Sequence, residues 1–186
     1  MADTPSEGTL EAAPSPQAPV PLPATATDAE RLVHVRAHWA GIEPNSPIYG
    51  LFFGNIRLVS ATNGRVLARL PVAAIHVNSK QILHGAVSAA LVDWAGGMAI
   101  ASTGRHGTGV SVDIHISYVS GARAGDELEI EAWVQRVGRS LAYTSVEIRK
   151  KLAGGGDGKE LDESRPTNGP VVASGSHTKY VNFPGK

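Results

Sequence analysis

Near the middle of the chain lies the segment Leu83-His84-Gly85-Ala86-Val87-Ser88-Ala89-Ala90-Leu91-Val92-Asp93. It places a His-Gly pair directly before a run of very small residues, which indicates a helix over about residues 85–103. Small side chains suit a helix that other backbone approaches closely, while Trp94 and Met98 supply bulk. One acidic residue, Asp93, lies inside this otherwise apolar segment. The stretch therefore predicts a helix that carries a lone carboxylate.

Only strands are expected after this helix. Residues 110–118 alternate cleanly between apolar and polar side chains, and residues 128–134 and 142–148 repeat the alternation. A last strand is expected over about 171–182. One face of the first strand is predicted to carry Val110, Val112, Ile114, Ile116 and Tyr118, and the other Ser111, Asp113, His115 and Ser117. A long helix followed by a meander of strands predicts an α+β fold, with an antiparallel sheet packed on that helix.

The residues before the helix predict the rest of a single domain over 28–183. Asp28 is expected to cap a first helix that stops near Gly41. Strand-like runs follow near Tyr49–Leu58 and Arg65–Val77, joined by a turn at Thr62-Asn63-Gly64. Residues 1–27 hold six of the twelve prolines and no Lys or Arg, so they predict a disordered tail. A polar, Gly-rich segment over 153–170 predicts a flexible hairpin loop.

Bulk composition narrows the function class. The chain has 186 residues, 17 basic and 17 acidic, so its formal charge of zero argues against general nucleic-acid binding. The absence of cysteine excludes a thiolate nucleophile and a Cys-based zinc site, and the seven histidines show no clear metal-ligand spacing. No apolar run reaches the roughly 20 residues of a membrane span. We expect an intracellular protein, with the cytoplasm favoured over the mitochondrion.

Two groups within residues 83–93 suit the chemistry of acyl transfer. The first amides of a helix lack intrahelical partners, so the Gly85 N–H is a candidate donor to an oxyanion. Asp93 is a candidate general base, or a nucleophile. Each has a plainer alternative, in which Gly85 only permits a tight turn and Asp93 is a buried carboxylate bonded to a hydroxyl. His84 is expected to orient the loop before the helix.

Helix geometry separates these two groups. Asp93 lies nine residues beyond His84, which corresponds to roughly 13 Å and about half a turn. One helix therefore cannot easily present its own Gly85 amide and its own Asp93 to one substrate. A two-fold mate with an antiparallel helix could supply the missing group. The spacing predicts a composite site at a homodimer interface.

Over about residues 45–182, this arrangement resembles the hotdog-fold acyl-CoA thioesterases, in the phenylacetate-pathway-like branch that includes the acyl-CoA thioesterase 13 family. The resemblance implies a hotdog fold, in which an antiparallel sheet wraps around a long central helix. It also implies hydrolysis of an acyl-CoA, with CoA as part of the substrate and no separate cofactor or metal, in a homodimer or a dimer of dimers. The matching positions are Asn78, His84-Gly85, Asp93, 109–113 (Gly-Val-Ser-Val-Asp), Tyr118, 138–142 and 175–179.

The resemblance also implies roles for single residues. It places the catalytic acid at Asp93, with Asn78 and Ser111 orienting water or the carbonyl. Without it, Asn78 reads equally well as a turn residue and Ser111 as part of a solvated strand face. The sequence departs from the family in the long loop over 154–170 and at Tyr180, where an animal relative carries His. The residues expected to contact the CoA nucleotide are Tyr118, Arg123, Arg136, Gly138, Arg139 and Lys179.

Two other functions compete with hydrolysis. A hotdog dehydratase or hydratase would need an Asp/His pair, and His84 and Asp93 are too far apart on one helix unless a partner subunit intervenes. A non-catalytic acyl-CoA-binding or scaffold protein would keep Asp93 buried for structure. Ser88 is a poor nucleophile candidate because no Gly-x-Ser-x-Gly elbow surrounds it.

Overall fold

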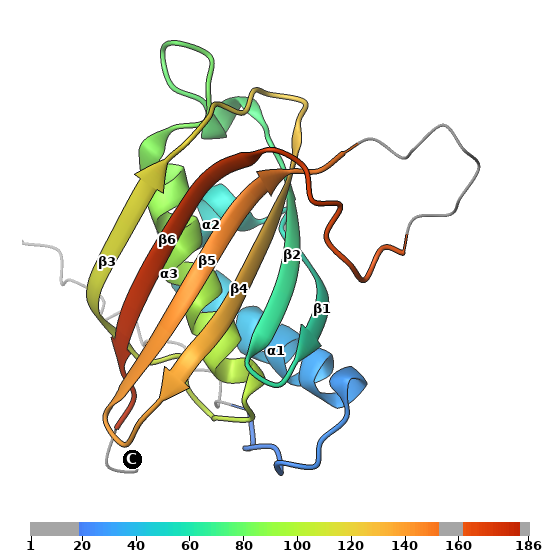
Figure 1. Ribbon diagram of the computed structural model, residues 1–186, viewed down its shortest axis with the longest axis vertical. Helices are drawn as coiled ribbons and strands as arrows, with labels where there is room; N and C mark the ends of the chain where they lie inside the picture. Colours follow the sequence, from blue (N-terminus) through green and yellow to red (C-terminus); the bar gives the residue numbers. More distant parts are fainter. Residues whose placement is uncertain (1–18, 153–161, 183–186) are drawn as a thin grey trace, which may run out of the picture.

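The computed structural model describes residues 19–152 and 162–182. A six-stranded antiparallel sheet of order β1-β2-β4-β5-β6-β3 curls around the long helix α3 (Figure 1). The predicted α+β architecture is confirmed. The elements are α1 (Asp28–Ile42), α2 (Pro47–Phe53), β1 (Arg57–Thr62), β2 (Arg65–Pro71), α3 (Gly85–Ser102), β3 (Val110–Tyr118), β4 (Glu127–Val137), β5 (Leu141–Lys150) and β6 (Val171–Tyr180), with 3-10 turns at Glu43–Asn45 and Ala74–His76.

Helix α3 forms the centre of the core because its small residues let the sheet approach. A Cβ atom at Gly96 would lie 2.8 Å from the Thr144 hydroxyl oxygen, so only glycine fits where α3 meets β5. Trp94, Leu91 and Met98 are fully buried and fill the remaining space. By length and composition α3 could cross a membrane, but 72% of it is buried inside this domain. Its apolar character is therefore that of a core helix.

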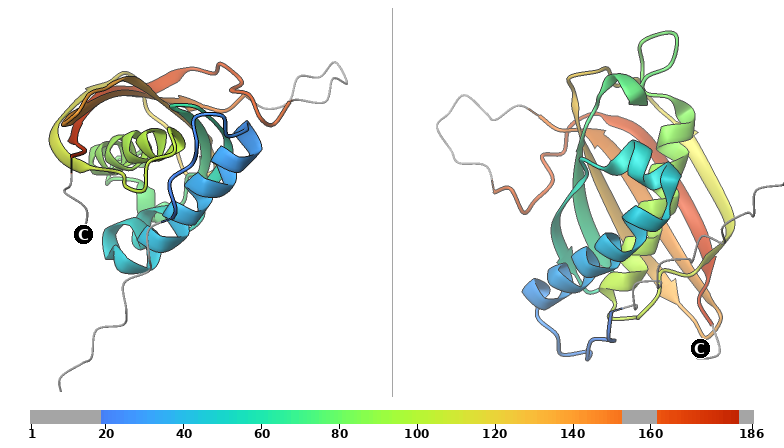
Figure 2. Two further views of the ribbon diagram at one scale, coloured as in Figure 1. Left: turned by 90° about the horizontal axis from the view of Figure 1, so that it is seen from below. Right: turned by 180° about the vertical axis from the view of Figure 1, so that it is seen from behind.

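Helix α1 lies along the open side of the curved sheet (Figure 2). Its N-cap is Thr27 rather than Asp28, which corrects the prediction by one residue. Thr27 has extended backbone, its hydroxyl accepts the Glu30 N–H, and the Glu30 carboxylate accepts the Thr27 N–H at 2.7 Å. This reciprocal capping box satisfies two helix-terminal donors, which Asp28, already helical, could not do.

Helix α2 replaces the first part of a predicted strand. The run near Tyr49–Leu58 was expected to be extended, but residues Pro47–Phe53 are helical and β1 begins only at Arg57. Pro47 favours a helix start, and the Tyr49 and Phe53 rings, four residues apart, stack at 5.6 Å. The prediction for Arg65–Val77 was also too long, because β2 ends at Pro71, whose ring nitrogen cannot donate to the ladder.

A bulge in β3 corrects the predicted strand faces. The pairing of β3 with β6 shifts between Ser111 and Asp113, so Val112 is an extra residue. As a result Ser111 and Tyr118, predicted on opposite faces, both point to α3, where they bond Asp93 and Gly85. The alternation of apolar and polar residues continues unbroken through Val112, so the inserted residue was not predictable from this pattern.

Strand β3 is also an edge of the sheet, and within the described part of the chain it pairs with β6 alone. Its apolar side chains are exposed, with Val112 58% and Ile114 40% accessible. An edge strand with a row of exposed β-branched residues offers unpaired backbone and apolar surface to another chain.

Two predicted flexible segments are described only in part. The predictions for residues 1–18 and 153–161 lie outside the described residues. The described remainder of the tail contacts the domain, since the Leu22 N–H donates to the Gly104 carbonyl at 2.9 Å. The described part of the loop is also attached, because the Thr167 N–H and hydroxyl both donate to Glu129 at 2.7 Å.

Two buried histidines predict acid sensitivity of the fold. Burial lowers the pKa of His38 and of His177 to about 4, from an ordinary value of 6.5. Between pH 6.5 and 4 these histidines are protonated in the unfolded chain but stay neutral in the folded chain. Their contribution to the free energy of unfolding is therefore fully present above pH 6.5 and is lost as the pH falls. Between pH 6.5 and 5 the loss is on the order of 2 kcal/mol for each histidine. We expect the melting temperature, measured by circular dichroism, to fall by about 10 °C.

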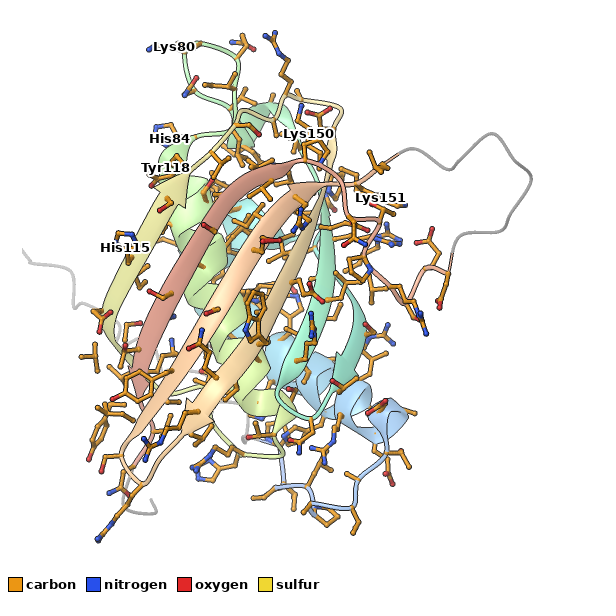
Figure 3. The ribbon with its side chains drawn as sticks, viewed as in Figure 1. Lys80, His84, His115, Tyr118, Lys150 and Lys151 are labelled. Atoms are coloured by element: carbon orange, nitrogen blue, oxygen red, sulfur yellow. The ribbon has the colours of Figure 1, made fainter. Side chains whose placement is uncertain are left out.

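A matched control is His115→Asn, because His115 is exposed on β3 and points away from the sheet (Figure 3). This variant should keep the wild-type pH dependence, whereas His38→Gln should flatten it. Equal melting temperatures of the wild type at pH 7 and pH 5 would contradict the prediction.

Candidate active site

Asp93 is the centre of a polar cluster drawn from four elements. Its Oδ2 accepts the Tyr49 hydroxyl of α2 at 2.6 Å. Its Oδ1 accepts the Ser111 hydroxyl of β3 at 2.9 Å and the Lys179 ammonium of β6 at 3.0 Å. His177 Nε2, also on β6, lies 3.5 Å from Oδ1. The structure thus joins the predicted pair Asp93 and Ser111, and adds three neighbours from distant parts of the chain.

These neighbours keep the Asp93 carboxyl ionised. Burial raises its pKa, but the Tyr49 hydrogen bond, the Lys179 charge and the bonds from Lys179 and Ser111 together lower it below the usual value. The Lys179 side chain is only 6% exposed, so its interaction with Asp93 is little screened by solvent. At neutral pH the site therefore presents a fixed carboxylate.

His177 is a neutral, fully buried member of the cluster. Its low pKa keeps the ring uncharged above about pH 4, mainly because of burial and secondarily because of the Lys179 charge. Both ring nitrogens lack a hydrogen-bond partner among the described residues. The sequence alone predicted no role for His177. The only signal was its place in Gly175-Ser176-His177-Thr178-Lys179, two residues before Lys179.

The start of α3 forms a second, separate polar region. His84 is the N-cap, and its Nδ1 accepts the Ala86 N–H at 3.0 Å, which satisfies one donor of the first helical turn. The Gly85 N–H makes no hydrogen bond with a described residue, while its carbonyl accepts the Tyr118 hydroxyl at 3.2 Å. His84 and Tyr118 lie side by side at the end of β3 (Figure 3).

A pocket of about 340 Å³ opens beside this helix start, lined by Asn78, Ile82, Gly85, Ser88 and Tyr118 among others. The side-chain Oδ1 of Asn78 accepts the Lys80 N–H at 2.8 Å, so this side chain stabilises its own turn, and Asn78 also lines the pocket. Asp93 does not line the pocket, since it lies eight residues beyond Gly85, about 12 Å along α3. Within one protomer the amide and the carboxylate are apart, as the spacing predicted.

The residues expected at the nucleotide do not form one group within a protomer. Arg123 follows β3 and lies at the end of the sheet that carries Tyr118. Arg136, Gly138 and Arg139 lie at the β4–β5 hairpin, at the opposite end (Figure 1). Lys179, expected at the mouth of the pocket, instead bonds Asp93. Over residues 19–152 and 162–182, no three His, Asp or Glu side chains come together to hold a metal ion.

Comparison with known proteins identifies the family. Residues 80–152 match the family model of the thioesterase superfamily. The human acyl-coenzyme A thioesterase 13 is 38% identical over 128 residues, which span 69% of this chain and 81% of the relative. The chain belongs to the thioesterase superfamily. It is a thioester hydrolase, as the sequence predicted.

Solved structures agree on the architecture of this thioesterase. The zebrafish thioesterase superfamily member 2 superposes with a TM-score of 0.66 at 32% identity, over 80% of this chain and 96% of that one. A hypothetical thioesterase from Streptococcus pneumoniae, solved with coenzyme A, superposes with a TM-score of 0.57 at 21% identity, over 69% and 87% of the two chains. The predicted hotdog fold is confirmed.

Proposed function

We propose that this thioesterase hydrolyses acyl-CoA thioesters at composite sites formed across a homodimer. The observation that carries the proposal is the division of one helix into two halves of a site: a free amide beside a pocket at Gly85, and an ionised carboxylate at Asp93. The substrate class is supported by the human relative, named an acyl-coenzyme A thioesterase, and by the coenzyme A in the pneumococcal structure.

In this mechanism a water molecule attacks the thioester carbon. Asp93 accepts one proton of that water, and the Gly85 N–H stabilises the negative charge that develops on the carbonyl oxygen. The tetrahedral intermediate then expels the CoA thiolate, which takes the proton back from Asp93, leaving free acid and CoA. Oδ2 accepts one hydrogen bond from the described residues, so an acceptor position on this oxygen remains open to a water molecule, which this role requires.

Strand β3 is the surface we propose for dimerisation. Its free edge and exposed Val110, Val112 and Ile114 suit pairing with the same strand of a second copy. Antiparallel pairing about a two-fold axis would place the two α3 helices side by side. The Asp93 half of one protomer would then face the Gly85 half of the other, with Ser111 beside its own Asp93.

The same pairing would bring the expected nucleotide contacts together. The hairpin end of one protomer, with Arg136 and Arg139, would lie beside the partner's end that carries Tyr118 and Arg123. The proposed substrate needs positive charge at the pocket mouth, because CoA carries phosphates. The separation of these residues within one chain is therefore compatible with a nucleotide site shared by two protomers. A Lys179 contact to the nucleotide is not part of this proposal.

Replacement of Gly85 by proline tests the oxyanion role. Gly85 is the first helical residue and His84 has φ −69° and ψ 134°, a conformation that proline tolerates in the residue before it. Gly85→Pro removes the N–H and should lower kcat about 10²- to 10³-fold, measured by CoA release from a panel of acyl-CoAs.

The matched control is Gly85→Ala, which retains the N–H. In both variants the new side chain meets the Tyr118 ring, which lies 3.3 Å from a Cβ at this position. Both variants are therefore crowded, but only the proline variant loses the N–H donor. The Ala variant should keep activity within a few-fold of wild type. Equal losses in the two variants would argue that crowding, and not the amide, limits the reaction.

A further inference from the structure

Tyr49 makes the shortest of the hydrogen bonds to Asp93, at 2.6 Å compared with 2.9 Å for Ser111 and 3.0 Å for Lys179. It comes from α2, outside residues 80–152 that match the superfamily model. The hydroxyl is a donor here, because burial and the Asp93 carboxylate raise the pKa of Tyr49 well above its usual range.

An aromatic cluster holds the Tyr49 ring in place. The ring stacks on Phe53 at 5.6 Å between centroids and tilts against Trp39 at 6.2 Å. Both of these rings pack on Trp94, the residue that follows Asp93, at 6.1 and 5.5 Å. The donor and its acceptor are thus fixed to the same buried group, which restricts rotation of the hydroxyl relative to the carboxylate.

The two oxygens of Asp93 are occupied unequally. A carboxylate oxygen can accept about two hydrogen bonds. Among residues 19–152 and 162–182, Oδ1 accepts two hydrogen bonds, from Ser111 and Lys179, while Oδ2 accepts one, from the Tyr49 hydroxyl. The Asp93 side chain is 30% exposed, so solvent or substrate reaches it. The acceptor position that remains on the carboxylate belongs to Oδ2, and Tyr49 fixes its direction.

We propose that Tyr49 is a positioning residue for hydrolysis, which directs the free acceptor position of Asp93 Oδ2 toward the attacking water. This inference rests on the proposed role of Asp93 as the group that accepts a proton from water. Without the hydroxyl, Oδ2 keeps a carboxylate lone pair but loses its fixed direction and one donor that favours the ionised form.

The Tyr49→Phe variant keeps the ring and removes the hydroxyl. We expect kcat to fall about tenfold with KM changed less than threefold, because the loss concerns the reacting water and not substrate binding. The acidic limb of the kcat–pH profile should move upward by about one pH unit, since Asp93 loses a hydrogen bond to its charged form. The control is Tyr143→Phe, because Tyr143 is exposed on β5 and should leave both readouts unchanged.

The Tyr49→Phe change made in the Asp93→Asn variant distinguishes failure of this inference from failure of the proposed function. If Tyr49 acts through Asp93, Tyr49→Phe should not lower the residual activity of Asp93→Asn any further. A tenfold loss in both backgrounds, or a lower melting temperature with kcat and its pH profile unchanged, would overturn the role of Tyr49. Full activity of Asp93→Asn would instead overturn the proposed function of Asp93, and with it the basis for this inference.

Discussion

Asp93→Asn is expected to reduce kcat for acyl-CoA hydrolysis by about 10²- to 10⁴-fold, the range typical for loss of a general base. Asparagine has nearly the same shape, but its amide cannot accept a proton from water. The Tyr49, Ser111 and Lys179 donors would then face a neutral group. Steady-state CoA release with saturating substrate measures the loss directly.

The buried Lys179 requires a stability control. Removing the Asp93 charge leaves the ammonium of a side chain that is only 6% exposed without its counter-ion, which itself destabilises the fold. Asp93→Asn combined with Lys179→Met removes the unpaired charge, so it should recover melting temperature without recovering activity. Asp28→Asn, in the exposed first turn of α1, is the neutral reference. Wild-type kcat in a folded Asp93→Asn protein would refute the proposed chemistry.

Mixing two inactive variants is expected to restore activity. In a dimer of Asp93→Asn with Gly85→Pro, one site receives the intact Gly85 of the first protomer and the intact Asp93 of the second, and the other site receives both changes. Random exchange of protomers between equal amounts of the two variants makes half of all dimers heterodimers. Each heterodimer has one working site of two, so about a quarter of wild-type activity should return. The gain is measured after exchange in mild denaturant, with different affinity tags used to isolate the heterodimer.

The controls for this experiment are the single variants carried through the same exchange, which should remain inactive. Mixing Asp93→Asn with Ser111→Ala provides a matched negative pair, because Ser111 bonds Asp93 of its own protomer. In a heterodimer of that pair, one site carries the Asp93→Asn change and the other carries the Ser111→Ala change, so neither site has both groups intact. An isolated Asp93→Asn/Gly85→Pro heterodimer with no activity would show that the two halves do not combine across an interface.

The fold was predictable where local pattern and tertiary environment agree. Helix α3 has small residues and strands β4 and β5 alternate because these elements pack against each other. The predicted bounds of these three elements were therefore nearly correct. The prediction failed for α2, because a seven-residue segment with apolar residues all round has no distinctive period. It also failed at β3, where one inserted residue turns Ser111 to the face opposite to the one that the alternating sequence predicted.

The site was predictable to the extent that the resemblance covered it. Asp93 and Ser111 are 18 residues apart and were expected to act together, which their 2.9 Å hydrogen bond supports. Tyr49 is 44 residues from Asp93 and Lys179 is 86 residues away, and no local spacing connects them. These contacts depend on how α2 and β6 pack against α3, so they became apparent only in the folded chain.

The bulge at Val112 has a consequence for descent within the superfamily. Ser111 reaches Asp93 because a single extra residue turns that part of β3 toward α3. If Val112 paired regularly with β6, without the bulge, Ser111 would turn outward while the residues from Asp113 to Tyr118 kept their faces. The bulge is therefore a determinant of the site in its own right, and relatives that share every side chain named above but pair this strand regularly would differ in chemistry.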